Sequence, residues 1–270
     1  MTGGDAVFAG SVPELYDRHL GPMLFVPFAD DLARRAHERA ASRVLEVAAG
    51  TGIVTRALHA ALPHARIVAT DLNEGMIAQG AQRLTHASIT WRQADAEALP
   101  FADDEFDLVV CQFGAMFFPD RVRAFKEAFR VLAPGGRFLL NVWSSLDENE
   151  IPRIVARAVA DAFPNDPPTF VERVPHGHGD PAVTTAELHA AGFSTVDVEI
   201  VELPSRAPSA VDPAIGFCQG SPLRAQIEAR DRARLGEITD AATAAVAERF
   251  GTGPIEAPMR AFVFDAVKES

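Results

Sequence analysis

Three short segments in the first hundred residues carry groups suited to holding a nucleoside. Glu46 precedes a turn at 50–52, where glycines let a ligand approach the backbone and the following helix offers free N–H groups. Asp71 closes the next strand, and its carboxylate can accept two hydrogen bonds from a ribose diol. Asp95 and Ala96 follow a third strand, where the carboxylate can accept from an adenine amino group and the Ala96 N–H can donate to a ring nitrogen. Alone, each has a plainer interpretation as a helix cap or a solvated loop. Their order and spacing favour an adenosine site.

The elements that would position these groups alternate in type along the first half of the chain. Apolar runs bounded by turns predict five strands, at 43–48, 66–70, 89–93, 106–113 and 137–143. Helical segments separate most of them. One has Val122, Phe125, Phe129 and Leu132 on a single face and ends at Pro134. This alternation predicts an α/β fold with a doubly wound, mostly parallel sheet and helices on both faces.

The pattern changes after Trp143, where prolines and glycines become frequent. We interpret 144–183 and 206–257 as insertions that cover the carboxyl ends of the strands, as lids over binding sites do. A helix, turn and strand over 185–203 and a last strand over 259–267 continue the sheet. Residues 1–42 are expected to form an N-terminal helical cap. The whole chain, 1–270, is then predicted to be one domain with helical cover insertions.

The composition argues against several classes of protein. Lys and Arg number 25 and Asp and Glu number 37, for a net charge of −12. Nucleic-acid binding needs basic patches, so no nucleic-acid partner is expected. Cys111 and Cys218 are too few for a disulfide framework or a Cys-rich metal site. No apolar run reaches the ~18 residues of a membrane span. Residues 1–10 lack the basic and apolar regions of a signal peptide, which predicts a cytoplasmic protein.

Four segments, in order along the chain, resemble the successive motifs of class I S-adenosylmethionine-dependent methyltransferases. They are VLEVAAGTGIVTRAL (44–58), ATDLNEGMI (69–77), QADAEALPFADDEFDLVV (93–110) and RVLAPGGRFLL (130–140). The last two are similar to the UbiE-like branch, which is named for quinone C-methyltransferases. The resemblance covers residues 11–143. It implies a Rossmann-like sheet of seven strands whose last strand is antiparallel. It also implies S-adenosylmethionine as the cofactor and S-adenosylhomocysteine as the product.

The same resemblance implies roles for individual residues. The glycine-rich motif falls on Glu46, Ala48, Gly50 and Gly52, with Ala48 standing where many members have glycine. An alanine there is harmless only if that residue does not need a positive φ. The other cofactor contacts would come from Asp71 at the ribose, Leu72 and Met76 near the adenine, Asp95 and Ala96 at its edge, and Gln112 and Phe113 by the methionine moiety. Tyr16, the only tyrosine, would close over the cofactor.

Transfer of a methyl group to an oxygen or an acidic carbon needs removal of a proton, and histidine is suited to this near neutral pH. His176 and His178 in the Pro-rich segment are candidate catalytic bases, although solvated loop positions are the plainer interpretation. His19, close to Tyr16, is a weaker candidate for the same work or for a substrate contact. No matched third ligand accompanies the His-x-His pair, so a metal site is not predicted.

The chain has 18 phenylalanines, most of them expected in the core. Those in two segments could instead line an apolar pocket: Phe25, Phe28, Phe113, Phe117 and Phe118. Such a pocket suits a small aromatic, quinone-like or lipophilic acceptor, methylated at O, C or N. Two alternatives stay open. One is a cofactor-binding protein of the same fold that transfers no methyl group. The other is an NAD-dependent oxidoreductase, against which Thr55 occupies the third glycine position of the dinucleotide motif. The oligomeric state also stays open, with a homodimer among the options.

Overall fold

The computed structural model describes residues 11–269, which form two compact units. Within the described residues, unit 1 contains 11–27, 144–179 and 202–260, and unit 2 contains 28–143, 180–201 and 261–269. The chain therefore passes several times between the units. The prediction that no signal peptide is present concerns residues 1–10, which lie outside the described residues.

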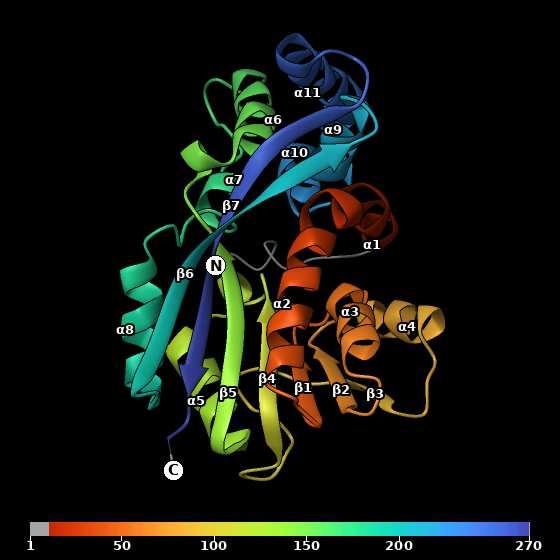
Figure 1. Cartoon of the computed structure of the whole chain (residues 1–270). Coiled ribbons are helices and arrows are strands. Elements are labelled where there is room, and N and C mark those ends of the chain that lie inside the picture. The colour runs from red at the N-terminus through yellow and green to blue at the C-terminus, as the bar shows by residue number, and fades with distance from the viewer. Residues whose placement is uncertain (1–10, 270) are drawn as a thin grey trace. The chain divides into compact units, whose positions relative to one another are not determined.

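A seven-stranded sheet runs in the order β3-β2-β1-β4-β5-β7-β6 (Figure 1). The strands are β1 (Arg43–Val47), β2 (Arg66–Asp71), β3 (Ile89–Gln93), β4 (Phe106–Gln112), β5 (Leu132–Trp143), β6 (Thr195–Ala207) and β7 (Ile255–Val267). The first five pair in parallel, β3 with β2, β2 with β1, β1 with β4 and β4 with β5. The last strand, β7, pairs antiparallel with β5. The predicted fold class is confirmed.

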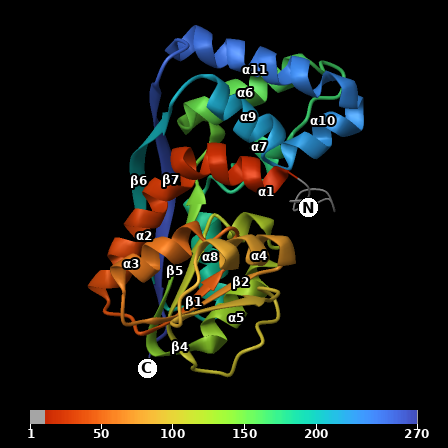
Figure 2. The same ribbon diagram turned by 90° about the vertical axis from the view of Figure 1, so that its right-hand side faces the viewer.

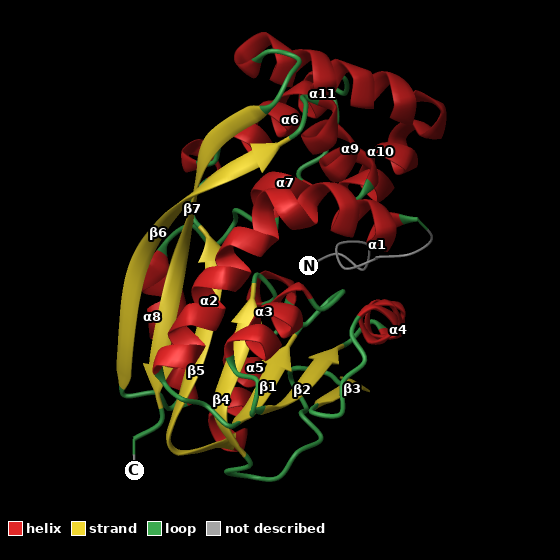
Figure 3. Ribbon diagram, turned by 45° about the vertical axis from the view of Figure 1, so that its right-hand side comes forward, coloured by secondary structure: helices red, strands yellow, loops and turns green. Residues whose placement is uncertain are grey.

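Helices cover both faces of the sheet in unit 2, with α2 and α3 over one face and α5 and α8 over the other (Figures 1 and 3). The helices are α2 (Val26–Glu38), α3 (Ile53–Ala61), α4 (Glu74–Arg83), α5 (Arg121–Val131), α8 (Pro181–Ala191) and the short 3₁₀ turn η2 (Ala115–Phe117). Phe125 of α5 and Leu188 of α8 pack with Val109, Leu140 and Phe264 of the strands in one fully buried core cluster. Burial on both faces explains why these strands are nearly continuous apolar runs.

Unit 1 is built mainly from helices, and α6, α9, α10 and α11 lie together in Figure 2. Its elements are α1 (Val12–Leu15), the π-helix η1 (Tyr16–Phe25), η3 (Leu146–Glu148), α6 (Glu150–Asp161), α7 (Phe170–Arg173), α9 (Val211–Gln219), α10 (Leu223–Asp231), η4 (Arg232–Arg234) and α11 (Leu235–Phe250). Val155 and Val159 of α6 and Ile238, Ala242 and Val246 of α11 are fully buried. These are the apolar positions whose helical spacing is evident in the sequence.

Strand β5 differs most from expectation, since it starts at Leu132 rather than at residue 137. The range of β5 includes Pro134, Gly135 and Gly136, but Gly135 has a φ of +79° and the register with β4 shifts between Phe106 and Leu108. The predicted turn is therefore present as an irregularity within β5. Gly135 N donates to Lys268 O at 2.7 Å, and Lys268 N donates to Gly136 O at 2.9 Å. These two bonds join the irregular segment to the residue that follows β7.

Candidate functional site

The carboxyl ends of β1 and β4 lie side by side at the point where the strand order reverses. Strands β2 and β3 continue to one side of β1, and β5 lies on the far side of β4. Open α/β sheets bind ligands in the crevice at such a switch point. Glu46 is paired in register with Ala69 on one side and Val110 on the other. The fold therefore brings the predicted residues of β1, β2 and β4 to one edge of unit 2.

The turn after β1 has a left-handed backbone, with φ of +56° at Ala48, +55° at Gly50 and +80° at Gly52. Within residues 11–269, no atom outside Gly50 and its two chain neighbours lies within 4 Å of the position that a Cβ on Gly50 would take. A Cβ on Gly52, in contrast, would collide with the ring of Trp91. The turn is thus packed against β3 at Gly52 and open to a ligand at Gly50. This is the close backbone approach that a nucleoside site needs.

Ala48 does adopt the positive φ at which an alanine is strained, roughly 1–2 kcal/mol above its right-handed conformation. The methyl group of Ala48 fills the space beside Gly114. A Cβ on Gly114 would lie 2.5 Å from the Ala48 Cβ and 2.9 Å from the Cys111 Sγ. The alanine side chain and the glycine at position 114 are therefore complementary.

Gly114→Ala is expected to lower the unfolding free energy by about 1–3 kcal/mol through overpacking. Adding Ala48→Gly should recover part of the loss, because it removes one of the two colliding atoms. Urea unfolding of the two single variants and the double variant measures this coupling. Strictly additive effects would show that the two positions do not share this space.

Asp71 is held in place by two backbone groups. Gly50 N donates to Oδ2 at 2.9 Å, and Asn73 N donates to Oδ1 at 2.8 Å. Burial raises the pKa of Asp71, while the hydrogen bonds from Asn73 and Gly50 oppose that rise. Each carboxylate oxygen has a second lone pair, so both can still accept from a pair of hydroxyls. The carboxylate is pre-oriented beside the open side of the glycine turn.

Glu46 is only 2% exposed, and its Oε2 accepts a hydrogen bond from Thr55 Oγ1 at 2.6 Å. Burial raises its pKa to about 8, with the nearby Asp71 contributing in the same direction. The backbone oxygen of Glu46 accepts from Thr70 Oγ1 at 2.8 Å. Glu46 thus ties β1 to both α3 and β2. Thr55, which departs from the dinucleotide motif, has a role here as the partner of this buried carboxyl.

The residues predicted at the adenine lie at the ends of β2 and β3. Leu72 is 64% exposed, whereas Met76 and Ala96 are buried. Asp95 is exposed and accepts a hydrogen bond from Glu97 N at 2.9 Å. An exposed leucine beside a buried methionine offers an apolar wall to a flat base. The side-chain types and their exposure fit the adenine base of a nucleoside.

At the end of β4, Phe113 has a φ of +51°, which is a strained conformation for a bulky residue. Its N–H donates to both the Oδ1 and the backbone O of Asn141, at 3.0 and 3.2 Å. Its ring stacks on Trp143 with a centroid distance of 3.8 Å, and Phe28 meets both rings edge-on. Phe28 has no exposed surface. Asn141 and Trp143 were not predicted as site residues. Like Gln112, they lie at the end of a strand, and this location could have identified them from the sequence.

The remaining predicted residues lie in unit 1, apart from Phe117 and Phe118, which are half-buried in unit 2. The rings of Tyr16 and Phe25 stack within η1 at a centroid distance of 4.8 Å. His176 is buried, its Nδ1 is 2.8 Å from Ser144 O, and burial lowers its pKa to about 4. His178 is half-buried in the same segment.

His19 and Asp212 form a close pair in unit 1, with His19 Nδ1 3.0 Å from Asp212 Oδ1. The sequence offers no local signal for this pair, because the two residues are far apart along the chain.

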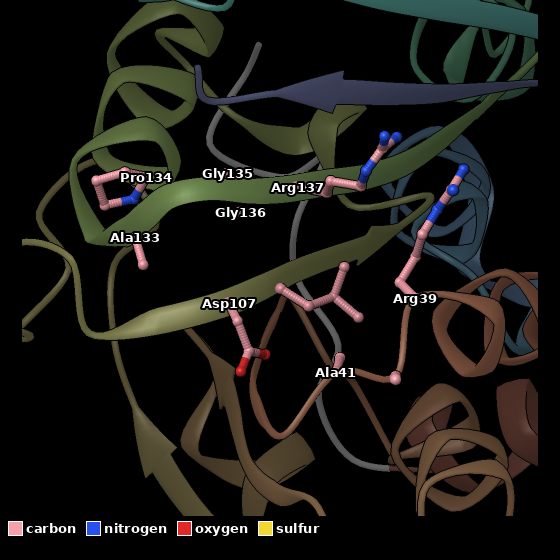
Figure 4. Close-up of a pocket in the computed structure, with 10 residues that line it drawn as sticks. Arg39, Ala41, Asp107, Ala133, Pro134, Gly135, Gly136 and Arg137 are labelled. Atoms are coloured by element: carbon pink, nitrogen blue, oxygen red, sulfur yellow. The ribbon is translucent and has the colours of Figure 1, made fainter. Parts of the chain in front are cut away.

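A separate hollow of about 270 Å³ lies at the opposite ends of β4 and β5 (Figure 4). Asp107, at the start of β4, and Arg39 and Arg137 contribute to its lining. The two guanidinium groups both bind Asp265 Oδ2, at 3.0 and 2.7 Å. Ligand sites of parallel sheets lie at the carboxyl ends of the strands, so this hollow is not the candidate site.

Neither a metal centre nor a membrane span emerges from residues 11–269. They contain no group of three or more His, Cys, Asp or Glu side chains placed to hold a metal ion. None of their helices has both the length and the apolar character needed to cross a membrane.

Comparison with known proteins points to a methyltransferase. A family profile described as a methyltransferase domain matches residues 45–140. The ubiquinone/menaquinone biosynthesis C-methyltransferase UbiE of Escherichia coli is 30% identical over 176 residues, which are 59% of this chain and 69% of the relative. UbiE of Dinoroseobacter shibae is 41% identical over 112 residues, 40% of this chain and 45% of the relative. The crystal structure of the YcgJ protein from Bacillus subtilis has a TM-score of 0.59 at 22% identity and covers 90% of this chain and 99% of that chain.

A parallel sheet with a glycine turn and strand-end carboxylates at its switch point defines a nucleotide-binding α/β protein. The chain belongs to the class I S-adenosylmethionine-dependent methyltransferases, in their UbiE-like branch. The cofactor of this family is S-adenosylmethionine. The chain spans less than half the length of the first 41%-identical relatives that it matches.

Proposed function

We propose that this chain binds S-adenosylmethionine at the carboxyl ends of β1 to β4 and transfers its methyl group to a small acceptor. The observation that carries the proposal is the pairing of Asp71 with Gly50. Asp71 is oriented by two backbone N–H groups, and the adjacent Gly50 faces open space. A ribose diol needs this arrangement, with two acceptor oxygens beside an accessible backbone.

The cofactor supplies an activated methyl group, so the protein mainly provides position and environment. Asp71 would hold the ribose, and Asp95 and Ala96 would contact the adenine edge. Positive charge disperses as the methyl group leaves sulfur, and an apolar surrounding does not oppose this. The stacked rings of Phe113 and Trp143, at the ends of β4 and β5, support such a surrounding.

For the acceptor we propose a small aromatic, quinone-like or lipophilic molecule. The curated relatives named ubiquinone/menaquinone biosynthesis C-methyltransferase support this class. Phe117 and Phe118, in the segment after β4, add half-buried apolar side chains to unit 2. His176 and His178 stay candidate bases. Tyr16 stays a candidate for closing over the cofactor.

Cofactor identity is tested by thermal shift. S-adenosylhomocysteine at 100 times its Kd should stabilise the protein by about 2.7 kcal/mol, and NAD should not. Stabilisation by NAD alone would overturn the cofactor assignment and favour the oxidoreductase alternative.

Transfer is tested with S-adenosylmethionine carrying a deuterated methyl group and a panel of phenols, hydroquinones and lipophilic amines. Mass spectrometry should detect the labelled methyl group in one product class. Binding of S-adenosylhomocysteine without any labelled product would favour the alternative of a protein that holds the cofactor and transfers no methyl group.

A further inference from the structure

The hollow at the amino ends of β4 and β5 lies at the other end of these strands from the proposed cofactor site (Figure 4). It measures about 270 Å³ and is bordered by the turn after α2, the start of β4 and the 133–137 segment of β5, all within unit 2. This volume lies just below the ~300–1,000 Å³ of pockets for drug-sized ligands. A ligand of this hollow would therefore be a small molecule.

Two arginines meet at one end of the hollow (Figure 4). Arg39 Nη2 and Arg137 Nη1 donate to the same oxygen, Asp265 Oδ2, at 3.0 and 2.7 Å. The Asp265 side chain is only 12% exposed, and it holds the two cations close together. Two guanidinium groups and one carboxylate leave one net positive charge beside the hollow.

Neither arginine uses the bidentate geometry that guanidinium and carboxylate groups commonly adopt. Each makes a single contact with Asp265, and no other side-chain hydrogen bond of Arg39 or Arg137 occurs within residues 11–269. A guanidinium group has five N–H donors, so both arginines keep N–H groups for another acceptor. Their side chains are 44% and 27% exposed, which leaves part of each accessible to a ligand.

The acidic residue that lines the hollow, Asp107, already has donors of its own. Its carboxylate accepts hydrogen bonds from Ser42 N, Ser42 Oγ and Arg43 N, at 3.1, 2.7 and 3.0 Å. Arg43 Nε lies 3.8 Å from the same carboxylate. Three hydrogen bonds and a nearby cation thus balance the charge of Asp107, and the positive charge of the arginine pair remains.

The rest of the lining is apolar and leaves room for the body of an organic ligand. Leu108, Ala41 and Pro134 contribute side chains without hydrogen-bonding groups. At Gly135, no atom of residues 11–269 outside that glycine and its two chain neighbours lies within 4 Å of the position that a Cβ would take. The irregular segment of β5 therefore leaves open space beside its backbone.

We propose that this hollow is a second binding site, for a small organic anion whose oxygens accept hydrogen bonds from the remaining N–H groups of Arg39 and Arg137. The shared chemistry is that of a carboxylate or a phosphate monoester on a compact apolar body. Charged acceptors form strong hydrogen bonds with guanidinium groups, and two adjacent guanidinium groups can share one anion. The site is independent of the proposed function, because none of its residues is assigned to the cofactor or the methyl acceptor.

Isothermal titration calorimetry with benzoate, phenyl phosphate and inorganic phosphate tests the site. Benzoate or phenyl phosphate should bind at one site per chain with a Kd of about 1 mM or tighter. Binding of benzoate alone identifies a carboxylate site, and binding of phenyl phosphate alone identifies a phosphate-ester site. Weaker binding of both organic probes than of inorganic phosphate would contradict the role of the apolar lining. Failure of all three to bind would overturn the proposal.

Three substitutions test whether the arginine pair holds the anion. Arg39→Gln and Arg137→Gln should each raise the Kd of the bound probe roughly 10- to 100-fold, since charged hydrogen bonds are lost. Asp265→Asn should instead lower the Kd by roughly tenfold, because the probe no longer competes with a carboxylate for the guanidinium groups. A shared disturbance of the fold would not produce opposite effects at residues in contact. Unchanged affinity in the two arginine variants, or weaker binding in Asp265→Asn, would overturn the proposal.

Arg66→Gln is the matched control, because it removes the same charge from an exposed arginine at the start of β2 in the same sheet. It should leave the Kd unchanged. An equal rise of the Kd in this control would attribute binding to the overall charge of the protein and count against the site.

S-adenosylhomocysteine separates the hollow from the cofactor site. A saturating amount should leave the Kd of the probe unchanged, because the two sites lie at opposite ends of the strands. Displacement of the probe would place the anion at the cofactor site and overturn the proposal. Absence of S-adenosylhomocysteine binding would contradict the proposed function alone, since the arginine variants still decide whether the hollow binds the anion.

Discussion

Asp71→Ala is expected to weaken the binding of S-adenosylhomocysteine by roughly 10- to 100-fold. Hydrogen bonds to a charged group contribute about 1.5–3 kcal/mol, and about 1.4 kcal/mol corresponds to a tenfold change in affinity. The carboxylate is already oriented by Gly50 N and Asn73 N, so little ordering opposes its contact with a ligand. Isothermal titration calorimetry measures the change.

Two further variants test whether the loss of affinity is specific to the Asp71 carboxylate. Asp71→Asn preserves the side-chain volume and one acceptor oxygen, so it should fold like the wild type and bind with intermediate affinity. Asp197→Ala removes an exposed aspartate on β6 of the same unit and should leave affinity unchanged. Wild-type affinity in folded Asp71→Ala would refute the assignment of Asp71 to the ribose.

The placement of Gly50, Gly52 and Asp71 at the ends of neighbouring strands can be predicted from the sequence because its determinants are local. Glycines at 50 and 52 follow directly on an apolar run, and Asp71 directly ends the next one. In a parallel sheet, residues that follow strands must meet at one edge, whatever the details of packing. The seven strands and the antiparallel last strand were implied by the family resemblance, and no local pattern encodes the strand order.

What the sequence did not predict depends on partners that are remote along the chain. The positive φ of Ala48 matches the absence of a side chain at Gly114, and the role of Thr55 follows from the burial of Glu46. His19 meets Asp212 only because α9 packs on η1. Helix α10 buries only Leu223 and Ile227, so its apolar pattern is too sparse to be recognised.

Glu46 is expected to make the stability of the folded protein depend on pH. Its pKa rises from an ordinary 4.5 to about 8 in the folded protein because burial disfavours the charged form. The folded state therefore binds this proton more tightly than the unfolded state. The contribution to stability is fully present below pH 4.5 and is lost as the pH rises through 8. Over that interval the loss amounts to at most about 5 kcal/mol, at 1.36 kcal/mol for each pKa unit.

Glu46→Gln removes this titration and retains an oxygen that can accept from Thr55 Oγ1. The variant and the wild type should have similar unfolding free energies near pH 5, and the variant should be more stable by several kcal/mol near pH 9. Urea unfolding followed by tryptophan fluorescence is a suitable measurement, because Trp91 and Trp143 both lie in unit 2 with Glu46.

The matched control is Glu248→Gln on α11, where the same change is made on an exposed side chain. It should leave the pH dependence of stability as it is in the wild type. If the difference in unfolding free energy between Glu46→Gln and the wild type stays constant from pH 5 to pH 9, Glu46 does not gain a proton on folding. Its carboxylate would then be stabilised in the charged form, and the buried bond from Thr55 would have to be reassigned as charge-assisted.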